Sequence, residues 1–210
     1  MSKIALTPNA SGSGTFTIAA PNSNTDRTLT LPDEAGTVLT SASTSNFPAG
    51  SVLQVVSTTK TDTFSVALSG GGDESGIVTG LTASITPSST SSKILVSVVA
   101  NVGLADHVLP GAGINLYRGA TQIGFGSDAT STQVSSAALV SESEGRTTEN
   151  ICFEILDTPA TTSSITYGVS LVRQSAAAGT NNFYINRGDS TGSSARFSLA
   201  STITVMEIAG

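Results

Sequence analysis

The chain has 210 residues, of which only 11% are charged, against about 25% in an ordinary soluble domain. Its 15 acidic residues outnumber its 9 basic ones and give a net charge of −6, which argues against nucleic-acid binding through clustered Lys and Arg. One Cys excludes an intramolecular disulfide, one Cys with one His excludes the usual structural zinc sites, and no apolar run approaches the roughly 20 residues of a membrane span.

Short β-forming runs bounded by turn residues open the chain: Thr15–Ala19, Arg27–Leu31 and Thr37–Leu39. About forty residues of this kind bury too little apolar surface to fold alone, so we expect this piece to pack against another chain. The polar segment Ser41–Gly50, which contains Pro48, is typical of a linker. We therefore predict an N-terminal anchor or stalk module, residues 1–45, and a larger domain, residues 46–210.

Similar short runs continue through the larger domain and are separated by Gly, Pro, Ser and Asn. This spacing predicts an all-β protein with an antiparallel β-sandwich or barrel, and the length suits a jelly roll of about eight strands. The expected strands are Ser51–Thr58, Thr61–Leu68, Ile77–Thr86, Lys93–Val102, Gly113–Tyr117, Gln122–Phe125, Gln133–Val140, Asn150–Leu156, Ser164–Arg173, Asn182–Asn186 and Arg196–Ile208.

Two of these runs carry further information. The run Ile94–Val99 is apolar on both faces, which predicts a central strand that is covered on both sides. Only one face of a sandwich strand meets the core, so its second face is expected to contact a neighbouring subunit. The run Ile203–Ile208 alternates, and we expect Glu207 to face outward and the C-terminus to lie within a sheet.

Candidate nucleophiles are few. His107, the one histidine, has Asp106 and Asp128 as conceivable partners in a Ser–His–Asp triad, but the sequence contains no Gly-x-Ser-x-Gly elbow. We therefore interpret His107 as a loop or interface residue. Cys152 lies in an apolar run, which predicts a buried and inert thiol.

The glycine-rich segment Ser69–Gly76 invites a phosphate or calcium interpretation. A phosphate loop needs a Lys followed by Ser or Thr and then a helix, and neither is present. Asp73 and Glu74 supply two side-chain ligands where calcium takes roughly six to eight oxygens. The segment is therefore interpreted as a turn.

Two pairs of carboxylates, Glu142 with Glu144 and Glu154 with Asp157, have the residue types that glycan hydrolysis uses. The chain contains no Trp that could form an aromatic platform for a sugar. We predict no enzymatic activity, no cofactor and no metal.

Residues 15–39 read TFTIAAPNSNTDRTLTLPDEAGTVL and resemble the short N-terminal module "aPn…dRtlTLPd.aGTvl" of many tailed-phage fibre and appendage proteins. The resemblance extends to the knob half of these proteins through SITPSSTSSKILV from Ser84, INLYRG from Ile114, YINR from Tyr184 and ASTITVMEI from Ala200. It implies a trimeric β-rich stalk or anchor that carries a jelly-roll knob similar to tumour-necrosis-factor or complement C1q domains.

The same resemblance implies a virion structural protein that is assembled in the host cytoplasm. Its expected partners are copies of itself in a homotrimer, other phage structural proteins, and a host surface glycan or protein. Matched to the module, the expected particle-anchoring residues are Phe16, Ile18, Pro21, Arg27, Leu29, Leu31 and Pro32.

Two functions remain open at this stage. The first is a short fibre that is anchored by its N-terminus and contacts the host through knob loops. Asp106 and His107 lie in one candidate loop, and Arg187 and Asp189, part of an Arg-Gly-Asp tripeptide that we interpret as a turn, lie in another. The second is a capsid decoration protein or head fibre that stabilises the phage head. The N-terminal module favours the fibre, and the lack of a long shaft favours decoration.

Overall fold

The structure of the chain is a computed structural model. It describes residues 7, 9–19, 21–30, 33, 35–36, 38–39, 47–104, 112–126, 138–140, 148–173, 179–188 and 198–210. The chain divides into two compact units, Met1–Val38 and Leu39–Gly210. The regular elements of the described residues are all β-strands, and these residues include no helix that could cross a lipid bilayer.

Each run expected in the larger domain overlaps an observed strand, so the strand prediction is confirmed there. The strands are β1 (Val52–Lys60), β2 (Phe64–Leu68), β3 (Glu74–Ile85), β4 (Lys93–Leu104), β5 (Ala112–Arg118), β6 (Thr121–Ile123), β7 (Ala138–Val140), β8 (Thr148–Asp157), β9 (Ile165–Arg173), β10 (Asn181–Ile185) and β11 (Ser201–Ile208).

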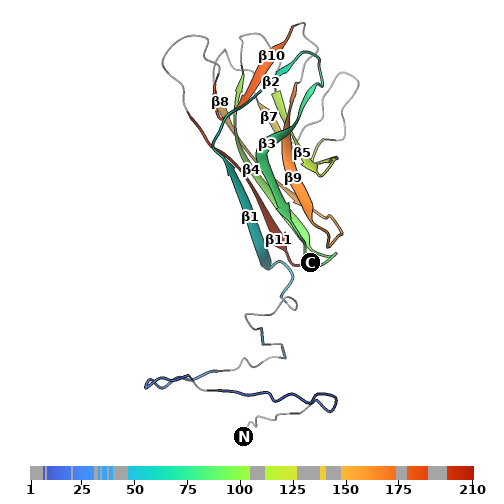
Figure 1. Ribbon diagram of the computed structural model, residues 1–210. Coiled ribbons are helices and arrows are strands. Elements are labelled where there is room, and N and C mark those ends of the chain that lie inside the picture. The colour runs from blue at the N-terminus through green and yellow to red at the C-terminus, as the bar shows by residue number, and fades with distance from the viewer. Residues whose placement is uncertain are drawn as a thin grey trace. The chain divides into compact units, whose positions relative to one another are not determined.

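The strands form two antiparallel sheets. Sheet A has the order β1-β11-β4-β10-β2, and β8 pairs with the other side of β4. Both β11 and β10 pair with β4, one along Lys93–Val99 and the other along Val102–Leu104, so they follow each other along one side of it. Sheet B has the order β3-β9-β5-β6, and β7 also pairs with β5. Figure 1 shows β1, β11 and β4 next to one another in the first sheet.

The pairing is nested along the chain. The first strands, β1 and β2, pair with the last, β11 and β10; β3 pairs with β9, β4 with β8, and β5 with β6 and β7. This is the pattern of one long antiparallel hairpin that is wrapped into two facing sheets, the jelly roll. The prediction of an all-β antiparallel sandwich is confirmed.

The core lies between the two sheets and follows the period of two that strands impose on their side chains. On β4, Ile94, Val96 and Val98 are fully buried, whereas the residues between them are half-buried on the other face. β4 therefore occupies the central position that its apolar sequence predicts. Burial of aliphatic side chains stabilises such a core by about 25 cal/mol per Å² removed from water. The facing side chains of sheet B include Ile114, Leu116, Val169 and Leu171.

The two ends of the sandwich differ in the parts of the chain that lie there. At the end that we call the base, the amide of Gly50 donates to the Ala209 carbonyl, and the amide of Ala209 donates to Ser51, both over 2.8 Å. These bonds continue the β1–β11 ladder, so the linker and the C-terminus meet there. At the opposite end, the tip, β4 and β9 end and β5, β8 and β10 begin.

The described residues of the N-terminal unit form no strand, in contrast to the expected strands Thr15–Ala19 and Arg27–Leu31. A strand needs a second strand to pair its backbone amides and carbonyls, and the described part of this unit offers none. Its large apolar side chains are consequently exposed: Phe16 by 85%, Ile18 by 77%, Leu29 by 87% and Val38 by 78%. The boundary expected between residues 45 and 46 stays a prediction.

Candidate functional site

The outer face of sheet A, which points away from the core, carries an apolar row across four strands. The register places Val55 of β1 beside Met206 of β11, Met206 beside Leu95 of β4, and Leu95 beside Leu156 of β8. The two ends of the row, Val55 and Leu156, are 55% and 52% exposed. The same alternation that buries Ile94 and Val96 inside turns this row outward.

Two further rows follow in the direction of the tip. Ser57, Thr204, Ser97 and Glu154 form the first, and Thr59, Thr202, Val99 and Cys152 form the second. Small hydroxyl-bearing side chains dominate them. We call these three rows together the A face.

Polar side chains on and beside the A face bond to one another along the sheet. The Ser57 and Thr204 hydroxyls lie 2.8 Å apart. In the neighbouring row, the Asn150 amide nitrogen donates to Asn101 Oδ1 over 3.1 Å, and the Asn101 amide donates to the Ala200 carbonyl over 2.7 Å. These side chains therefore use sideways bonds for part of their hydrogen-bonding capacity.

Cys152 lies on the A face and is exposed, so the prediction of a buried thiol is wrong. Ile151 next to it points into the core, and alternation along β8 then turns Cys152 outward. The thiol contacts Asn150 Oδ1 at 3.1 Å.

Of the two carboxylate pairs with the residue types of a glycosidase, Glu154 and Asp157 do not come together. Glu154 lies on the A face, whereas Asp157, three residues later, faces the core beside Ile94. Glu142 and Glu144 lie outside the described residues. Among the described residues of the three rows, Glu154 is the one charged side chain, and Lys93, exposed at the base on β4, is the nearest base in register.

The outer face of sheet B is already covered within the chain. Asn115 is 1% exposed, Ser170 is fully buried, and Ile77 packs so closely over Gly168 that a Cβ there would touch its side chain. Glu74 accepts hydrogen bonds from the Asn115 amide and, over 2.6 Å, from the Tyr117 hydroxyl. Burial, with Glu74 beside it, raises the pKa of Tyr117 to about 12.

The first part of the glycine-rich segment, Ser69–Asp73, is a turn, as interpreted from the sequence, whereas Glu74–Gly76 belong to β3. Asp73 accepts hydrogen bonds from the amides of Gly70 and Ser69, which lower the pKa of its carboxyl. Its carboxylate and that of Glu74 therefore serve different partners and do not converge on one ion. Within the described ranges, no group of three or more acidic, His or Cys side chains could hold a metal.

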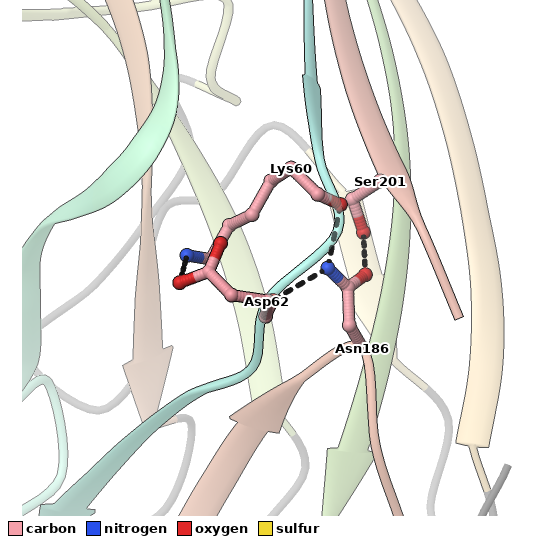
Figure 2. A network of polar contacts seen from close by, with 4 residues as sticks. All are labelled: Lys60, Asp62, Asn186 and Ser201. Carbon is pink, nitrogen blue, oxygen red and sulfur yellow. Dashed lines mark hydrogen bonds and ion pairs between the residues drawn. The ribbon is translucent and has the colours of Figure 1, made fainter. Parts of the chain in front are cut away.

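A buried polar network holds sheet A together where β1 passes to β2 and β10 passes to β11 (Figure 2). Asn186 has a φ of +66° and donates its amide hydrogens to the carbonyls of Lys60 and Asp62 over 2.8 and 2.9 Å. Its Oδ1 accepts from the Ser201 hydroxyl over 2.6 Å. Lys60, 4% exposed, forms an ion pair with Asp62 at 2.8 Å, and this hydrogen bond lowers the pKa of Asp62.

Replacing Asn186 with Ala is expected to lower the free energy of unfolding by about 2 kcal/mol, because three buried hydrogen bonds are lost and Ala is strained at positive φ. Asn186→Gly is the matched control, since it removes the same bonds without the backbone strain. It should cost about 1 kcal/mol less than Asn186→Ala. Urea unfolding at one protein concentration measures both values, and equal losses would show that the φ of Asn186 carries no cost.

The residues predicted as functional from the sequence are distributed over both units. Phe16, Ile18, Pro21, Arg27 and Leu29 are exposed in the N-terminal unit, and Leu31, Pro32, Asp106, His107 and Asp189 lie outside the described residues. Arg187 is half-buried beside Gly103 of β4, with its guanidinium 4.1 Å from the centre of the Tyr184 ring. A Cβ at Gly103 would overlap the Arg187 carbonyl oxygen, so only glycine fits there.

The sequence predicted a second apolar face on Ile94–Val99, but it did not reveal which residues of the other strands lie on the A face. The available signal was an apolar residue at both parities of a strand: Val55 next to Val56 on β1, and Leu156 next to Ile155 on β8. Only the register between strands shows that these residues form one row.

Comparison of the sequence with protein-family models and with curated proteins gives no match. Among solved structures, similar chains come from infectious bursal disease virus. A chain of the Gx strain is 17% identical with a TM-score of 0.43, covering 77% of this chain and 33% of that one. A chain of virus-derived T=1 particles is 12% identical with a TM-score of 0.38, covering 83% and 44%. A chain of the VP2 subviral particle is 11% identical with a TM-score of 0.35, covering 75% of this chain and 38% of that one.

This chain thus spans less than half the length of these solved chains. TM-scores below 0.5 do not establish a shared fold, so the architecture described above rests on the strand pairing of this chain alone.

Proposed function

We propose that this protein is a virion structural protein: a short homotrimeric fibre whose N-terminal unit anchors to the particle and whose sandwich contacts the host surface. One observation carries the proposal. In the segment that resembles the phage appendage module, the described residues form no strand in the single chain, and Phe16, Ile18 and Leu29 are almost fully exposed. Exposed apolar groups of this size favour contact with another protein surface.

The two ends of the sandwich support the proposed contact between its tip and the host surface. The linker enters at the base, where Gly50 pairs with Ala209. The tip, where β4 ends at Leu104 and β5 begins at Ala112, lies at the other end of the strands. The connection 105–111, which holds Asp106 and His107, joins these strand ends. An anchored N-terminus leaves the tip connections as the natural contacts with a host glycan or protein.

The alternative is a capsid decoration protein or head fibre that stabilises the phage head. The short linker favours it, because the N-terminal unit ends at Val38 and strand β1 already begins at Val52. This chain therefore has no long shaft of its own between the two units. Both functions use the same fold and differ in the place of the protein on the particle.

Antibody against this chain, labelled with gold and viewed on intact particles by electron microscopy, separates the two. We expect label at the tail or its tip, and loss of label when Phe16 and Leu29 are both changed to Asp in the full-length chain. Thr25→Asp, an exposed change in the same unit, is the control and should leave the label in place. Label scattered over the head would favour decoration, and absence of label from every particle would overturn the proposal.

A further inference from the structure

We propose that copies of this chain associate through the A face, with sheet A of one copy packed against sheet A of the next. The inference deepens the proposed function, on which it rests, by naming the surface that the copies share. Its first support is the apolar row from Val55 to Leu156, which crosses β1, β11, β4 and β8 without interruption. Aliphatic side chains that are more than half exposed at both ends of such a row gain by being covered.

Several polar side chains on and beside the A face already have partners, so that covering them costs little. Hydroxyl and amide groups lose water on association, and a group left without a partner destabilises the complex. Here the Ser57 and Thr204 hydroxyls bond to each other, and Asn101 and Asn150 bond sideways beside the face. A second flat sheet can therefore lie on these rows without having to supply every hydrogen bond.

The distribution of charge points to a second copy as the occupant. The chain carries a net charge of −6, so copies repel one another at long range. The A face holds one acid, Glu154, and the outer side of sheet A continues past the apolar row to Lys93, two positions before Leu95 on β4. This outer side therefore carries one acid and one base, which suits an identical surface in which the acid of one copy can approach the base of another.

The place where the linker enters the sandwich also favours the A face as the surface that the copies share. Gly50 and Ala209 extend the β1–β11 ladder at the base of sheet A. The linker therefore enters sheet A close to the apolar row, which begins at Val55 of β1. The described part of sheet B offers no equivalent surface, because Asn115 and Ser170 on its outer face are already buried. A closed symmetric assembly would thus cover the A face.

The test compares the wild-type protein with the double variant Val55→Lys/Leu156→Lys. Both positions are exposed in the single chain, so the fold tolerates lysine there, while two cations without partners inside an interface should weaken association by about a hundredfold or more. Sedimentation velocity gives the mass of each protein. Phe125→Lys is the matched control, because Phe125 is 46% exposed but follows β6 of sheet B.

Cys152 provides a second readout in the unmodified protein. It is the one thiol of the chain and lies on the A face, so a water-soluble disulfide reagent reports whether the face is covered. We expect a wild-type oligomer whose thiol reacts at least about tenfold more slowly than that of the double variant, which should sediment as a single chain.

The outcomes separate the two proposals. A wild-type protein that sediments as a monomer would contradict the assembly on which the proposed function depends. A wild-type oligomer with a fast thiol, or one that survives the double substitution, would leave that assembly standing and overturn the A face as its surface. If Phe125→Lys dissociated to the same extent, the A face would also be overturned as the shared surface, because a positive charge added anywhere would then be enough to dissociate the oligomer.

Discussion

Replacing Asp157 with Ala is expected to lower the free energy of unfolding by about 3 kcal/mol, the lower end of the range found when one partner of a buried ion pair is removed, because Asp157 and Arg118 are only partly buried. Asp157 lies on β8 of sheet A and faces the core at the base. Arg118 Nη1 of β5 donates to both of its carboxylate oxygens, over 2.9 and 3.0 Å, and the Tyr167 hydroxyl of β9 donates over 2.6 Å. The carboxylate thus joins the two sheets.

The size of the effect follows from the groups that remain. Tyr167 is fully buried, and its burial, reinforced by Asp157, raises its pKa, so its hydroxyl stays protonated and needs an acceptor. Without Asp157 that hydroxyl has lost the acceptor that it uses. Arg118 is less affected, because 30% of its side chain is exposed and water can solvate part of it.

Two milder substitutions serve as controls. Asp157→Asn keeps an oxygen for Tyr167 but removes the charge that holds Arg118, and should cost about 2 kcal/mol. Tyr167→Phe removes the hydroxyl and leaves the ion pair, and should cost about 1 kcal/mol. Urea unfolding at one protein concentration gives all three values. If Asp157→Ala cost no more than Tyr167→Phe, Asp157 would not be the link between the sheets.

The positions of the strands in the sandwich could be predicted from the sequence because their signals are local. Alternating apolar residues and the intervening Gly, Pro, Ser and Asn suffice to locate β4 or β9 within a few residues. The segment Thr15–Ala19 has the same local signal but forms no strand in the single chain. Whether this segment forms a strand depends on a second strand that pairs with its backbone, and the sequence of one chain does not show such a partner.

The side assignments of Cys152 and Glu207 failed for a shared reason. Both predictions were based on residue type, which places a thiol in the core and a carboxylate in solvent. The face that each side chain occupies is instead set by the apolar residues around it on the same strand. Ile151 occupies the core position on β8, so Cys152 is outside, and Ile203 and Val205 define a core face of β11 that also contains Glu207.

The candidate site shows a second limit. The A face consists of residues from four strands that lie far apart in the sequence, and the order of these strands follows from nested pairing over the whole domain. The apolar run Ile94–Val99 revealed that a second face would need a partner. The partner residues in the same rows, such as Met206 and Leu156, depend on register, which a single-residue slip would reverse.

Glu207→Gln is expected to lower the free energy of unfolding by about 3 kcal/mol at neutral pH, because hydrogen bonds to a buried carboxylate are stronger than those to an amide. Glu207 is fully buried at the base. It accepts from the amide and hydroxyl of Ser88, both over 2.7 Å, from the Ser92 hydroxyl over 2.6 Å, and from Gln54 over 2.6 Å. Glutamine keeps one oxygen that can accept, but its amide nitrogen replaces the other oxygen and faces a donor from which it cannot accept.

The same contacts make this contribution dependent on pH. Burial by itself raises the pKa of Glu207, but the hydrogen bonds from Ser92, Ser88 and Gln54 outweigh it and bring the pKa below its ordinary value of 4.5. A group whose pKa is lower in the folded chain binds its proton more readily in the unfolded chain. Its stabilisation is therefore complete above pH 4.5 and declines as the pH falls through the folded pKa.

The difference in unfolding free energy between wild type and Glu207→Gln should therefore be largest near pH 7 and shrink below pH 4.5. Asp62 and Asp73 also have lowered pKa values and weaken the folded state in acid with the same sign, but both proteins retain them, so they cancel in the difference. Thr25→Ser, an exposed change in the N-terminal unit that leaves the charge of the chain unaltered, should match wild type at every pH. Parallel pH profiles for wild type and Glu207→Gln would mean that the buried carboxylate does not titrate with folding, and that its donors hold a group of constant charge.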